Sequence, residues 1–64
     1  MVKFIEVHEQ GEERMVNLAW VEEVRMNGHG AAVIYFAFQT DGNIDQDSII
    51  TDETYDEVKR MIWR

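Results

Sequence analysis

Hydrophobic and polar residues alternate along most of the chain, a pattern typical of β-strands that bury one face. Residues 2–7 form the first such segment. Gly11 then offers a turn position that tolerates a positive φ, and residues 13–18 predict a second strand that pairs back on the first as a hairpin. A corner at Ala19-Trp20 separates this hairpin from the next segment.

A third strand is predicted over residues 21–26, with simple alternation that places Val21 and Glu23 on the same face. Residues 27–30, with the sequence Asn-Gly-His-Gly, form the strongest turn signal in the chain. Asn-Gly supplies the two residues at ease with positive φ that a two-residue hairpin loop needs. We therefore expect a tight hairpin between the third strand and the fourth.

Residues 31–38 are rich in β-branched and aromatic residues and are apolar on both faces. Such a strand is expected at the centre of a sheet, with cover on two sides. A second turn at 40–43 leads into a weaker strand around residues 44–50.

The last segment changes from the period of a strand to that of a helix. Tyr55, Val58 and Ile62 recur on one helical face. Thr54 and Glu57, three residues apart, form a capping-box sequence at the predicted helix start. The chain therefore predicts an α+β fold: an antiparallel β-meander of four to five strands with one C-terminal helix packed on the sheet.

With 64 residues the chain is expected to form a single domain, 1–64, with a small core. A domain of this size buries only about 60% of the surface of its unfolded chain. No cysteine is present, so disulfides cannot add stability. Oligomerisation is the simplest remaining way to stabilise such a core, which favours a homo-oligomer.

The net charge of −7 argues against nucleic acid and anionic membranes as partners, because both require clustered Lys and Arg. The acidity serves solubility or offers an acidic face to a basic partner or a cation. No apolar stretch approaches the roughly 20 residues that span a bilayer, and no signal peptide is recognisable. A cytoplasmic location is therefore expected.

One acidic segment has the spacing of a calcium loop. Oxygen-bearing side chains at every second position can wrap a hard cation. The candidate ligands are Asp41, Asn43, Asp45, Asp47 and Asp52. The glycine that such a loop needs at its sharp turn is missing, and the alternative is that these residues form the solvent face of an edge strand.

The residues available for catalysis are few. Ser48 is the only serine and has no histidine near it in the sequence, while His8 and His29 lack the ligand spacing of a zinc site. We expect neither an enzyme nor a cofactor.

The aromatic residues divide into two groups. Phe4, Phe36, Phe38 and Tyr55 are predicted to form the core between sheet and helix. Trp63, one position off the helical stripe of Tyr55, Val58 and Ile62, and Trp20, at the corner, are expected to be partly exposed.

A protein-contact surface is predicted from Trp20, Val33, Tyr35 and Trp63. Exposed tryptophans next to an apolar sheet face are enriched in binding hot spots. One short helix covers only one face of a meander, so the other apolar face needs a second copy of the chain or another protein. The predicted function is a non-enzymatic interaction or accessory module that self-associates, and the alternative is the calcium-binding module.

Four features occur in a recognisable order: an opening strand, a glycine turn, an Asn-Leu pair at 17–18 before Val-Glu-Glu-Val at 21–24, and a capped helix over 53–62. In this order the chain resembles the small flagellar FlbD-type proteins and related uncharacterised bacterial β-rich proteins along its whole length. The resemblance implies a cytoplasmic, non-enzymatic bacterial protein and carries over no functional residues.

Overall fold

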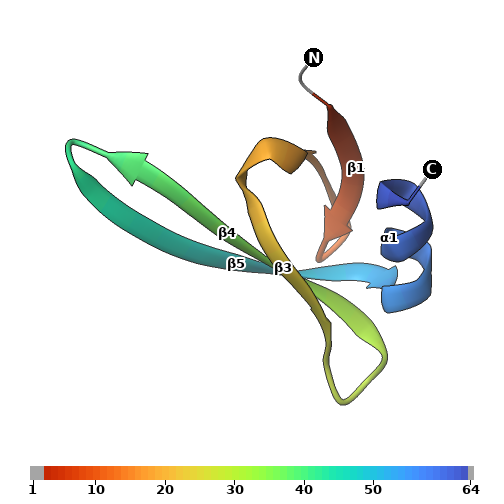
Figure 1. Cartoon of the computed structure of the whole chain (residues 1–64). Helices are drawn as coiled ribbons and strands as arrows, with labels where there is room; N and C mark the ends of the chain where they lie inside the picture. Colours follow the sequence, from red (N-terminus) through yellow and green to blue (C-terminus); the bar gives the residue numbers. More distant parts are fainter. Residues whose placement is uncertain (1–2, 64) are drawn as a thin grey trace.

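The computed structural model describes residues 3–63, apart from the side chains of residues 38–40 and 45, and shows five strands followed by a C-terminal helix (Figure 1). In chain order the elements are β1 (Phe4–Glu9), β2 (Glu12–Asn17), the 3-10 helix η1 (Leu18–Trp20), β3 (Val21–Met26), β4 (Ala31–Thr40), β5 (Asn43–Thr54) and α1 (Tyr55–Ile62). The strands form two antiparallel sheets, β1–β2 and β3–β4–β5. The predicted α+β meander with a packed C-terminal helix is confirmed.

The first hairpin has a two-residue loop formed by Gln10 and Gly11. Both residues have positive φ angles, 50° and 83°. Such a loop matches the right-handed twist of the two strands. At the end of the hairpin away from this loop, a further hydrogen bond joins the two strands: the backbone N–H of Leu18 donates to the carbonyl of Lys3 at 3.0 Å. The predicted turn at Gly11 is confirmed.

A β-bulge interrupts the regular alternation of β3. The register of β3 against β4 shifts between Val21 and Glu23, which leaves Glu22 as the extra residue. Val21 and Val24 therefore both pack against the core, while Glu22 and Glu23 are both exposed. The prediction that Val21 and Glu23 share a face was wrong, because a bulge turns the following side chains to the other face.

The turn between β3 and β4 uses Asn27 differently from the prediction. Its side-chain Oδ1 accepts hydrogen bonds from the backbone N–H groups of His29, at 2.8 Å, and Ala31, at 3.0 Å. The positive φ falls on Gly30, at 82°, and not on the Asn27-Gly28 pair. A four-residue loop with an Asx turn therefore replaces the expected two-residue loop.

The β4–β5 hairpin is longer than expected and extends past the rest of the sheet. Phe36 is the last residue of β4 that pairs with β3. Beyond it, the two strands continue alone to the Asp41-Gly42 turn, and we call this part, residues 37–46, the arm. Figure 1 shows the arm projecting away from α1.

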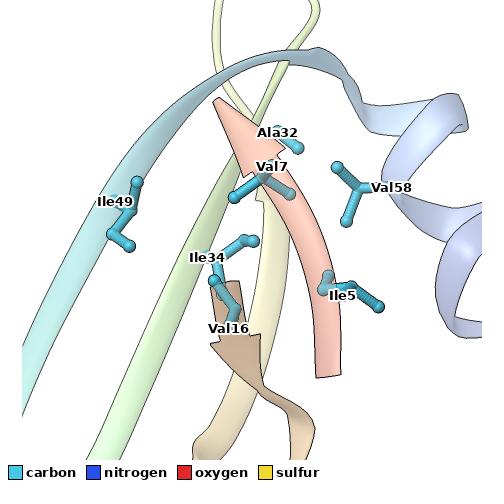
Figure 2. Close-up of a cluster of buried hydrophobic side chains, with 7 residues drawn as sticks. All are labelled: Ile5, Val7, Val16, Ala32, Ile34, Ile49 and Val58. Carbon is cyan, nitrogen blue, oxygen red and sulfur yellow. The ribbon is translucent and has the colours of Figure 1, made fainter. Parts of the chain in front are cut away.

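The core is aliphatic and lies on one face of the β3–β4–β5 sheet. Side chains from the β1–β2 hairpin, from β4 and β5 and from α1 meet there (Figure 2). They are Ile5, Val7, Val16, Ala32, Ile34, Ile49 and Val58. The β1–β2 hairpin and α1 thus cover the same sheet face. Its one buried polar side chain among the described residues is Thr51, which donates through Oγ1 to the carbonyl of Ala32 at 2.9 Å.

The predicted aromatic core was wrong for Phe4, which is half-exposed. Ile5 and Val7 face the core, so the strand alternation turns Phe4 to the opposite face. Phe36 is half-buried and packs against the core, and Tyr55 is half-buried beside Trp63 and Val24. The side chain of Phe38 lies outside the described residues.

The C-terminal helix begins as predicted. The Thr54 hydroxyl accepts from the backbone N–H of Glu57, and the Glu57 carboxylate accepts from the backbone N–H of Thr54, both at 3.1 Å. This capping box sets the orientation that buries Val58 in the core. Among residues 3–63, no helix is long and apolar enough to cross a membrane.

Candidate functional site

The face of the β3–β4–β5 sheet that points away from the core, which we call the outer face, carries the predicted contact residues Val33 and Tyr35. Ile50 of β5 pairs with Val33 and is 59% exposed. Val33 itself is buried, and Tyr35 is half-buried. The β1–β2 hairpin and α1 pack on this sheet from the opposite side, where both contribute to the core.

The outer face carries charges of both signs. Arg25 Nε lies 2.9 Å from Glu23 Oε1, and the guanidinium lies 5.5 Å from the centre of the Tyr35 ring. The hydrogen bond to Glu23 raises the pKa of Arg25 further above its ordinary value. Glu22, at the bulge, borders the same surface. A second copy of the chain would therefore meet a guanidinium here as well as carboxylates.

A second apolar surface lies between the β1–β2 hairpin and the base of the arm. It is a hollow of about 270 Å3. We call it the aromatic hollow, and its apolar lining includes Phe4, Met15, Trp20 and Phe36. Three of these side chains, Phe4, Met15 and Trp20, are exposed, so the hollow is open to solvent.

Trp63 lies apart from both surfaces, just after the end of α1. Its side chain is 79% exposed, and Lys59 Nζ lies 5.5 Å from the centre of its ring. With Tyr55, Ile62 and Val24 it borders a smaller hollow of about 180 Å3. A cation–π contact at such an exposed position is worth only about 0.5–1 kcal/mol.

The four predicted contact residues therefore lie in three places. Val33 and Tyr35 share the outer face, Trp20 lines the aromatic hollow, and Trp63 stands beside α1. The prediction did not include Ile50, which continues the outer face. It also left out Phe4 and Met15, although the alternation that buries Ile5 and Val7 already places Phe4 on the exposed side of its strand.

The candidate calcium ligands are spread along an extended strand. Asp41 is in the turn, Asn43 begins β5 and Asp52 is near its other end, nine residues further on. At about 3.3 Å per residue, this separates Asn43 from Asp52 by roughly 30 Å. The side chain of Asp45 lies outside the described residues. Among those that are described, no group of three His, Asp or Glu side chains is placed to hold a metal ion.

Asp52 and its neighbour Glu53 fasten the first hairpin to the three-stranded sheet. The Asp52 carboxylate accepts hydrogen bonds from the backbone N–H groups of Gly11, at 2.8 Å, and Gln10, at 3.2 Å. Glu53 accepts from the backbone N–H of His8 at 2.7 Å, and its second oxygen lies 2.6 Å from His8 Nδ1. We call these contacts the hairpin clamp.

The hairpin clamp changes the pKa values of its two ionisable partners in opposite directions. The hydrogen bond to Glu53 raises the pKa of His8 above its ordinary value of 6.5. Burial raises the pKa of the Glu53 carboxyl, but the hydrogen bonds from the backbone and imidazole of His8 outweigh it, so the pKa lies below its ordinary value of 4.5. At a pH between the two pKa values, His8 is therefore protonated and Glu53 is ionised, so both partners are charged.

The melting temperature is expected to fall as the pH rises through the neutral range. A raised pKa means that protonated His8 stabilises the fold fully below pH 6.5, and this contribution is lost as the pH rises through the folded-state value. The lowered pKa of Glu53 acts at the other end, with stability lost as the pH falls below 4.5. Because the His8 side chain is 40% exposed, solvent screening keeps the change small.

Circular-dichroism melting curves from pH 5 to pH 8 test this expectation. A His8→Gln variant is the control, because it removes the titrating group and keeps a polar side chain. The wild-type protein should lose more stability than the variant as the pH rises. Parallel profiles for the two proteins would show that His8 does not titrate against Glu53.

Comparisons with protein-family models, with curated proteins and with solved structures find no match.

Proposed function

We propose that this protein is a non-enzymatic interaction module that self-associates through the outer face of its sheet. One observation carries the proposal: the elements that pack on the sheet lie on the other face, while Ile50 stands 59% exposed beside Val33 and Tyr35. Burying apolar side chains against a second surface is favourable, by about 25 cal/mol for each Å2 removed from water.

Two further features support a second copy as the occupant of the outer face. Arg25 and Glu23 give this face opposite charges, so a twofold arrangement can set the guanidinium of one copy near a carboxylate of the other. The core of one chain is also small, with seven buried aliphatic side chains among the residues that the structure describes, and added burial between copies would stabilise it. A location in the cytoplasm and the resemblance to FlbD-type proteins stay predictions from the sequence.

Light scattering across at least a tenfold concentration range tests the proposal. The wild-type mass is expected to reach twice the 7.6 kDa of one chain, and an Ile50→Glu variant should lower the association constant by about tenfold or more. Ile50 suits this test because it is exposed, whereas a charge at the buried Val33 would unfold the chain.

A Trp63→Ser variant is the matched control, since it removes an exposed aromatic ring from a different surface. It should associate like the wild type. A monomer at every concentration would contradict self-association. An unchanged dimer in Ile50→Glu would place the contact elsewhere than the outer face.

A further inference from the structure

Carboxylates border the apolar lining of the aromatic hollow on two sides. Glu6 is the cross-strand partner of Met15 and lies on the same exposed face of the hairpin as Phe4. Glu13 follows on that face, and Asp47 of β5 lines the opposite wall. An apolar hollow is thus bordered by negative charge on both the hairpin and the arm side.

The two glutamates of the hairpin are close enough to affect each other. The pKa of Glu6 is raised, first because its carboxyl shares a hydrogen bond with that of Glu13 and second because the two negative charges repel. The two residues are diagonal neighbours across the strand pair, a separation that long side chains can bridge. A cation bound next to Glu6 and Glu13 would relieve this repulsion.

The cations on this side of the molecule already have partners or face another way. Arg14 lines the hollow, but it forms an ion pair with Glu9, in which Arg14 Nη1 lies 2.6 Å from Glu9 Oε1. The imidazole of His8 is bonded to Glu53. Lys3 lines a neighbouring hollow on the α1 side of β1, which Glu6 also lines. The negative charge around the aromatic hollow therefore exceeds the positive charge that the chain itself supplies there.

This excess decides which partner fits. A second copy would bring the same carboxylates to the hollow, where like charges repel, whereas the outer face also offers the guanidinium of Arg25. We propose that the aromatic hollow binds a segment of a different protein, which inserts a large apolar side chain between lysine or arginine residues. The apolar side chain packs between Phe4, Met15 and Trp20. The flanking cations reach Asp47 in the lining and Glu6, which lies beside Met15 on the hairpin.

The experiment uses a capped peptide with one leucine between two pairs of lysines as the probe. It is titrated to millimolar concentration into the 15N-labelled full chain, and backbone and indole N–H shifts are recorded. Shifts are expected at Phe4, Met15, Asp47 and the indole of Trp20. The matched peptides replace the leucine by alanine, or the lysines by glutamates, and neither should bind measurably at the same concentration.

Variants separate the two parts of the recognition. Met15→Ser should weaken binding about tenfold, and Asp47→Asn about two- to fivefold. Ile50→Ser, on the outer face, should leave the affinity unchanged, so this test does not depend on self-association. Each variant changes an exposed residue, and its amide spectrum reports whether it is folded.

Three outcomes would overturn the proposal. The first is the absence of shifts at the hollow, and the second is equal binding of the alanine peptide, which would mean attraction by charge alone. The third is a change in the amide shifts of Phe4 and Met15 with protein concentration in the absence of peptide. That result would make a second copy of the chain the occupant of the hollow.

Discussion

Replacing Ile34 by alanine is expected to leave most of the protein unfolded at 25 °C. Ile34 of β4 is fully buried, where side chains of the β1–β2 hairpin and of β5 meet Val58 of α1 (Figure 2). Removing three methyl or methylene groups from such a site costs about 2–5 kcal/mol. A single core in a chain of this size rarely supplies more than about 3–5 kcal/mol, so the loss is comparable to the whole stability.

Urea titration followed by circular dichroism measures this effect. The matched control is Ile44→Ala, the same substitution in the arm, where the side chain is 73% exposed. It should change the free energy of unfolding by less than about 0.5 kcal/mol. If Ile34→Ala unfolded at the same urea concentration as the control, the core would not depend on the contacts that Ile34 makes.

Features set by neighbouring residues could be predicted from the sequence. The capping box of Thr54 and Glu57 requires two side chains three residues apart, and it forms as expected. The turn at Gly11 follows from a residue that adopts positive φ without strain. The antiparallel meander follows from alternation and turn positions, which are also local signals.

Features that depend on pairing between strands could not be predicted in the same way. The bulge at Glu22 is visible only once β3 is aligned with β4, and it reverses the expected orientation of the residues after it. The full length of β5 likewise depends on its partner, because its acidic half is weak as a strand when considered alone. The hydrophobicity of Phe4 predicts a core position, but its strand buries only one face, and Phe4 lies on the other.

The candidate surfaces combine residues that are far apart in the sequence. The aromatic hollow joins the first strand, the 3-10 corner and the middle of β4. From the sequence, Trp20 is recognisable as an exposed aromatic residue, but only the position of the hairpin places it in the same hollow as Met15. That position depends on the hairpin clamp, whose partners His8 and Glu53 are 45 residues apart.

Replacing Glu53 by alanine is expected to be the most damaging change outside the core. The carboxylate is only 13% exposed, and it accepts from the backbone N–H of His8 while contacting its imidazole. A hydrogen bond to a charged group contributes about 1.5–3 kcal/mol, and a buried N–H left without a partner adds to the cost. We expect a loss of about 2–3 kcal/mol, which a small domain barely tolerates.

The strands whose amides lose protection from hydrogen exchange distinguish this effect from a general weakening of the fold. Hydrogen exchange should accelerate first at the amides of β1 and β2, because their hairpin loses a clamp while β3, β4 and β5 keep their ladder. Glu53→Gln is the control: its amide oxygen still accepts from the His8 backbone, so it should retain more stability than the alanine variant but lose the His8-dependent change with pH. Uniform acceleration over all five strands in Glu53→Ala would mean that the hairpin is held by the core alone, with the clamp contributing little to its position.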